Sequence, residues 1–77
     1  MGVGLVTGSE LRLLRHLKRG PLYIGAIELV LGVSPTRARV LVRSLNKRGY
    51  VEHDALAQVH TWKITREGEE IVEAMTP

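Results

Sequence analysis

Five basic side chains with no acid among them form the most chemically distinctive segment of this 77-residue sequence. They lie between residues 35 and 49, and they are Arg37, Arg39, Arg43, Lys47 and Arg48. A basic segment without acids is the footprint expected of a surface that binds a polyanion such as nucleic acid. The alternative is a solvated helix face with no ligand. Residues 50–77 carry a net charge of −4, so the positive charge is concentrated in the middle of the chain.

Other chemistries lack the residues that they need. No cysteine is present, which excludes disulfides, cysteine zinc sites and thiol nucleophiles. Ser34 has no attending His–acid pair, and adjacent Glu69 and Glu70 would point apart on a helix. His53 and His60 could face each other, but with no third ligand nearby they make a poor zinc site. We therefore expect neither an enzyme nor a bound metal or cofactor.

Membrane insertion and secretion are not expected either. No uncharged stretch exceeds nine residues, whereas a membrane-spanning helix needs about 20 apolar residues. The first eight residues have neither a basic region nor a long apolar one, so they do not form a secretory signal. We expect a cytoplasmic protein, and the composition is that of one globular domain over residues 1–77, with residues 1–8 as a flexible or extended arm.

Two helices are expected to precede the basic segment. Thr7 and Glu10 have capping-box spacing, and the apolar periodicity after them predicts a helix that ends near Arg19. A short extended piece at 22–23 and a second helix at about 24–31 should follow. Gly32 would close that helix.

The basic segment itself is predicted to be a helix over residues 35–48. Ser34 is a good N-cap, and Pro35 suits the first helical position because its missing N–H would be unpaired there. One stripe of this helix is apolar, and it comprises Ala38, Leu41, Val42 and Leu45. Packing of that stripe leaves the opposite, basic face free.

After Gly49 the pattern changes from helical spacing to strands. Residues 50–53 and 59–64 read as two strands joined by a loop at 54–58, with His60, Trp62 and Ile64 on one face. Thr65 would cap a final helix of two to three turns, whose first turns are acidic. The fold class is therefore α+β: a helix-turn-helix in a three-helix core, a wing hairpin of two to three strands, and a C-terminal helix.

Three sequence motifs, in order, resemble the winged helix-turn-helix family, especially transcription regulators of the MarR-like kind. They are Leu29-Val30-Leu31-Gly32-Val33-Ser34-Pro35 at the turn, the stretch from Leu41 to Val51, and Ile64-Thr65-Arg66-Glu67-Gly68 before the last helix. The resemblance covers about residues 9–75. It implies sequence-specific binding of double-stranded DNA by a small, nucleoid-associated homodimer that regulates transcription.

The resemblance also implies which residues contact DNA. Helix 35–48 would lie in the major groove, with Thr36, Arg37, Arg39, Val40 and Arg43 facing the bases and Arg39 and Arg43 as candidates for bidentate contact with guanine. Ser34 would hold a phosphate at the helix start, and Lys47 and Arg48 would contact phosphates at most. Of these, Ser34, Thr36, Arg37, Arg39, Val40, Arg43 and Lys47 make up the predicted DNA-binding set.

The wing departs from that pattern. Many DNA-binding relatives carry basic residues at the wing tip, whereas residues 54–58 here have no positive charge and one negative charge. This favours a second hypothesis, in which the winged helix is a protein-interaction module of a larger assembly. Leu56 at the tip would then contact the partner protein. Trp62 is expected to pack on the core beside Val51 and Ile64, with stacking on a base as the alternative.

Overall fold

The computed structural model describes residues 6–57 and 60–75, which form four helices and three strands. In chain order these are α1 (Gly8–Leu17), β1 (Leu22–Tyr23), α2 (Ile24–Leu31), α3 (Pro35–Lys47), β2 (Val51–His53), β3 (Thr61–Ile64) and α4 (Arg66–Ala74). The predicted order of elements is confirmed. The predicted helix ends lie one to two residues too late, and the strands are shorter than expected.

Helix α1 begins with the predicted capping box. The Thr7 side chain accepts a hydrogen bond from the backbone N–H of Glu10 (3.2 Å), and the Glu10 carboxylate accepts one from the backbone N–H of Thr7 (2.9 Å). Residues 1–8 were expected to form an arm, but Val6 is buried and Gly8 is already helical. Residues 1–5 of that arm lie outside the described residues.

The helix-turn-helix joins α2 to α3 through one left-handed residue. Gly32 has φ +67°, a conformation that glycine adopts without steric cost, and its N–H and that of Val33 both donate to the Glu28 carbonyl. Ser34 then caps α3 by accepting a hydrogen bond from the backbone N–H of Arg37 (3.1 Å), with Pro35 as the first helical residue. The predicted turn chemistry is confirmed.

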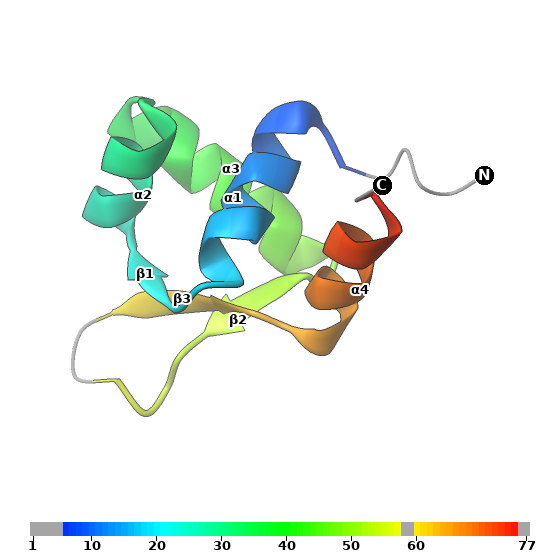
Figure 1. Ribbon diagram of the computed structural model, residues 1–77. Coiled ribbons are helices and arrows are strands. Elements are labelled where there is room, and N and C mark those ends of the chain that lie inside the picture. The colour runs from blue at the N-terminus through cyan, green and yellow to red at the C-terminus, as the bar shows by residue number, and fades with distance from the viewer. Residues whose placement is uncertain (1–5, 58–59, 76–77) are drawn as a thin grey trace.

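The sheet is antiparallel, in the order β1-β3-β2, so the returning strand of the hairpin is central. Trp62 faces Leu22 on one side and His53 on the other, and Ile64 faces Val51. Helices α1, α2 and α3 pack together beside this sheet, and the hairpin projects past them (Figure 1). The wing is therefore a three-stranded sheet rather than a free hairpin.

The core lies between the helices and the sheet. Its largest fully buried side chains are Leu13, Leu14, Leu17, Ile27, Leu45 and Val51. The predicted apolar stripe of α3 is confirmed, because Ala38, Leu41, Val42 and Leu45 are all buried. With that stripe packed inward, the orientation of the basic face of α3 is fixed.

The start of α4 is tied to the turn after α3. The Thr65 hydroxyl donates to the Gly49 carbonyl (2.6 Å) and accepts from the Gly68 N–H (3.1 Å), and the Thr65 N–H donates to the Tyr50 carbonyl (3.0 Å). Gly68 approaches so closely that a Cβ there would lie 2.3 Å from the Tyr50 carbonyl oxygen. These contacts anchor the C-terminal end of α3 against the last helix.

Candidate nucleic-acid interface

The free face of α3 carries every predicted contact residue that belongs to the helix. Thr36, Arg37, Arg39, Val40, Arg43 and Lys47 are all exposed, and so is Ser34 at the cap. Thr36, Val40, Arg43 and Lys47 follow the i, i+4, i+7, i+11 spacing of one helical stripe, and Arg39 flanks it. The structure thus brings these residues to one surface.

The cations on this face are available to an external anion. Within residues 6–57 and 60–75, no ion pair involves Arg37, Arg39, Arg43 or Lys47. Ser34 can also still contact a phosphate. Its oxygen accepts the cap hydrogen bond from the Arg37 backbone, but its hydroxyl proton is left to donate.

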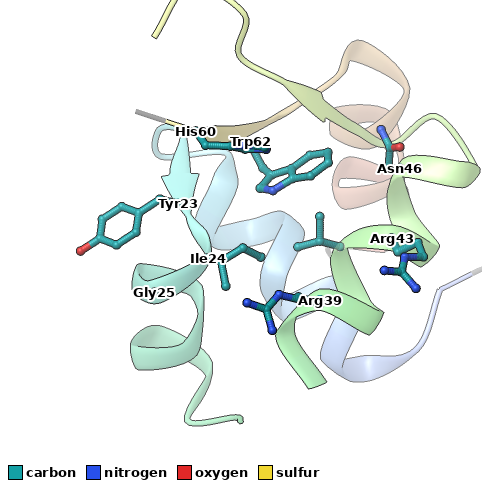
Figure 2. A pocket seen from close by; sticks show the side chains of 9 residues that line it. Tyr23, Ile24, Gly25, Arg39, Arg43, Asn46, His60 and Trp62 are labelled. Carbon is teal, nitrogen blue, oxygen red and sulfur yellow. The ribbon is translucent and has the colours of Figure 1, made fainter. Parts of the chain in front are cut away.

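A hollow of about 570 Å³ separates α3 from the central strand (Figure 2). Arg39, Val42, Arg43 and Asn46 of α3, His60 and Trp62 of the wing, and Tyr23, Ile24 and Gly25 at the start of α2 line it. Figure 2 shows the indole of Trp62 reaching from β3 toward α3, with the two arginines on the opposite wall. The basic face of α3 therefore continues into a partly apolar cleft that ends on the wing.

Trp62 has both of the roles that the sequence left as alternatives. It is partly buried and packs against the hydrophobic core, as expected. The same side chain also lines the hollow, so part of the ring is open to a ligand. Two other lining residues, Tyr23 and Asn46, were missed, because neither lies in the basic segment and only the β1–β3 pairing brings Tyr23 beside the wing.

Arg48 belongs to a different structure than the sequence suggested. Rather than facing DNA, its guanidinium donates to the Glu10 carboxylate (2.7 Å) and to the Ser44 hydroxyl (2.8 Å), and Ser44 donates to the same carboxylate (2.9 Å). The expectation of a phosphate contact is therefore corrected: Arg48 ties the end of α3 to the start of α1. The signal in the sequence was Glu10, whose capping role concealed a second set of partners.

This network determines the ionisation of Glu10. Burial of the carboxylate raises its pKa, but the hydrogen bonds from the Thr7 N–H, Arg48 and Ser44, together with the positive charge of Arg48, outweigh that effect. The pKa of Glu10 is consequently held below its ordinary value. The carboxylate is negatively charged at neutral pH, and it fixes α3 without using any cation of the free face.

The wing tip carries no cation among its described residues. The Asp54 carboxylate accepts a hydrogen bond from the Leu56 N–H (3.2 Å) and so closes the turn. The Leu56 side chain is 94% exposed. Gln58, also part of the predicted loop, lies outside the described residues.

A second basic surface lies on α1. Arg12, Arg15, His16 and Arg19 line a shallow hollow of about 200 Å³. Within the described part of the chain, none of these arginines takes part in an ion pair. This surface could contact a nucleic-acid backbone, but it has no apolar floor with which to read bases.

Two further searches found nothing within the described residues. No group of three or more His, Asp or Glu side chains there could hold a metal ion. None of their helices is long and apolar enough to cross a membrane.

Comparisons with known proteins agree on the fold. A transcriptional regulator of Thermotoga maritima, Tm0710, superposes with a TM-score of 0.80 at 29% identity, over 88% of this chain and 50% of that one. ZitR of Lactococcus lactis, solved in complex with DNA, gives 0.80 at 15% identity, over 88% and 49%. The repressor MarR of Listeria monocytogenes gives 0.81 at 18% identity, over 92% and 49%. This chain thus spans about half the length of these proteins.

Sequence comparison gives the family. No curated protein matches the chain. The family model described as "MarR family" matches residues 6–57, from the start of α1 to the wing tip. That range includes the turn motif, the basic helix and the first wing strand. Together with the four helices, the three-stranded wing and the agreement with solved MarR-type regulators, this match shows that the chain is a winged-helix member of the MarR family.

Proposed function

We propose that this domain binds double-stranded DNA in a sequence-specific manner, with α3 in the major groove. The observation that carries the proposal is the free face of α3, where four basic side chains are exposed without ion-pair partners in the described chain. Phosphates are the ligands that such a surface attracts most strongly. The structure of ZitR with DNA supports the proposal by showing that a protein of this fold binds the same ligand.

The division of labour follows from position on the helix. Arg39 and Arg43 are one turn apart and line the hollow, so we assign them to base edges, where a guanidinium can contact guanine through two hydrogen bonds. Thr36, Arg37 and Val40 lie in the first half of the helix and complete the base-reading surface, with Val40 placed to meet a thymine methyl group. Ser34 and Lys47, at the two ends of the helix, contact phosphates.

Regulation of transcription as a homodimer extends the same proposal. Helix-turn-helix proteins bind two half-sites about one helical turn apart, so a second copy would double the number of phosphate contacts. Light scattering on the protein with and without a palindromic duplex measures the assembly directly.

The test is fluorescence anisotropy of a labelled duplex, titrated at about 50 and 200 mM salt. If about four phosphates are neutralised per protomer, log affinity falls with log salt at a slope of roughly −4. Removing Arg39 or Arg43 should weaken binding and reduce the slope by about one. R66A is the matched control, because Arg66 is an exposed arginine of α4 that pairs with Glu70. Equal binding by all three variants would refute the proposal.

A second function, as a protein-interaction module, is favoured by Leu56 alone. A leucine exposed at 94% on an uncharged tip has the character of a hydrophobic anchor. L56S should abolish capture of a protein partner while leaving DNA binding unchanged. A variant that loses DNA affinity instead would place the wing tip on the DNA.

A further inference from the structure

His53 and His60 lie against each other across the hairpin, outside the set of predicted contact residues. His53 is the last residue of β2, and His60 immediately precedes β3. Their Nε2 atoms are in direct contact, and the rings meet edge to face with centroids 3.8 Å apart. The His53 ring also packs on the Trp62 indole, at a centroid distance of 4.2 Å.

We infer that His53 and His60 form a two-imidazole site for a borderline divalent cation such as Zn²⁺ or Cu²⁺. Neutral imidazole is a preferred ligand of these ions, and here two Nε2 atoms converge from neighbouring strands. Both side chains are exposed, so a cation has a path to the site. The competing explanation is a simple hydrogen bond, in which one Nε2–H donates to the other ring.

The strand pairing makes this site rigid enough to bind. Register places His53 opposite Trp62, and the Asp54 N–H donates to the Thr61 carbonyl (3.0 Å), which continues the ladder toward His60. The backbone on both sides of the pair is therefore fixed, and Trp62 buttresses the His53 ring. Fewer side-chain rotations are lost on binding than in an unconstrained pair.

Two protein ligands leave coordination positions open. Zinc sites that are purely structural use four protein ligands, whereas those with three or fewer keep positions for water or an incoming group. The earlier expectation of no structural zinc site is compatible with this, since no third protein ligand is proposed. His60 also lines the hollow that contains Arg39 and Arg43, so the open positions lie beside the candidate nucleic-acid interface.

A phosphate oxygen or a purine nitrogen of bound DNA is therefore placed to complete the coordination. This second step rests on the proposed function, whereas the metal site itself does not. Reciprocity requires that if DNA completes the site, metal strengthens DNA binding by the same factor by which DNA strengthens metal binding.

The metal site is tested on untagged protein by calorimetric titration with ZnCl₂ and then CuCl₂, in the absence of DNA. We expect one ion per chain, with Cu²⁺ bound more tightly than Zn²⁺. Loss of an outer partner alone weakens metal sites by about 10- to 100-fold, so H53A and H60A should each weaken binding at least about tenfold. H16A is the matched control, because it removes the third histidine of the chain, which lies on α1.

The outcomes separate the two steps. Equal zinc and copper affinity in wild type, H53A and H60A, with folding verified by circular dichroism, would overturn the metal site. If the ions bind through the pair, anisotropy titrations with and without ZnCl₂ test the coupling: a zinc-dependent gain in DNA affinity that H53A/H60A lacks supports it, and no gain overturns it. Failure of DNA binding without metal in all proteins would count against the proposed function alone.

Discussion

Removing the Glu10 carboxylate is expected to destabilise the domain more than removal of any exposed acid. The carboxylate accepts hydrogen bonds from the Thr7 N–H, the Ser44 hydroxyl and the Arg48 guanidinium, at 2.9, 2.9 and 2.7 Å. Its side chain is 7% exposed, whereas that of Arg48 is 33% exposed. After truncation of Glu10, Arg48 can therefore turn partly to water, but the polar atoms behind it cannot.

The magnitude follows from those contacts. Losing one partner of a buried ion pair costs about 3–5 kcal/mol, and the partial exposure of Arg48 places this pair at the lower end, about 3 kcal/mol for E10A. E10Q keeps an oxygen for the capping box and loses only the charge, which predicts about 1.5 kcal/mol. For a domain of this size, each kcal/mol shifts Tm by about 4–8 °C, so E10A should melt about 12–24 °C below wild type.

The pH dependence identifies the mechanism. Because the folded-state pKa of Glu10 lies below its ordinary value, the stabilisation is fully present above about pH 5 and is lost as pH falls through the folded-state pKa. The difference in unfolding free energy between wild type and E10Q should thus be largest at neutral pH and shrink below about pH 4.

Thermal and urea unfolding, followed by far-ultraviolet circular dichroism, give both quantities. A double-mutant cycle with E10Q and R48M isolates the pair from the cap. The reasoning would be refuted by a coupling energy near zero, or by an E10Q deficit that is the same at pH 7 as at pH 3.

Four further perturbations test other parts of the structure. S34A removes the α3 cap and should cost about 1 kcal/mol in urea unfolding, with P35A as a milder comparison; no loss would mean that α3 does not depend on its cap. G68A forces a methyl group against the Tyr50 carbonyl, 2.3 Å away, and should lower stability by at least about 2 kcal/mol; a neutral result would contradict the close approach. R39A should reduce the salt slope of DNA binding by about one, and an unchanged slope would remove Arg39 from the interface. L56S should leave the free energy of unfolding within about 0.5 kcal/mol, and a larger change would show that the wing tip packs on the domain.

Local rules explain why so much of the fold was predictable. Each helix start is encoded within four residues, as at Ser34–Arg37 and Thr7–Glu10, and the α3 stripe has clean helical periodicity. The exposure of the α3 contact residues follows from the same pattern. These features depend on neighbours in sequence, so the sequence alone was sufficient to place them.

Long-range pairing was not accessible in the same way. Glu10 and Arg48 are 38 residues apart, and nothing in the spacing of either one indicates the other. The involvement of Tyr23 in the hollow likewise depends on β1 joining the sheet beside Trp62. Such contacts are decided by how the elements pack, and for that reason Arg48 was assigned to phosphate when its charge serves the core.

The dimensions of the sheet also bear on solubility. Both outer strands are very short, two residues in β1 and three in β2, and Pro21 precedes β1 without an N–H to offer. A strand from another molecule could therefore find only a few free backbone groups with which to pair. Aggregation through growth of this sheet is disfavoured by its geometry, and contacts between copies are left to side chains on the helices and the hairpin.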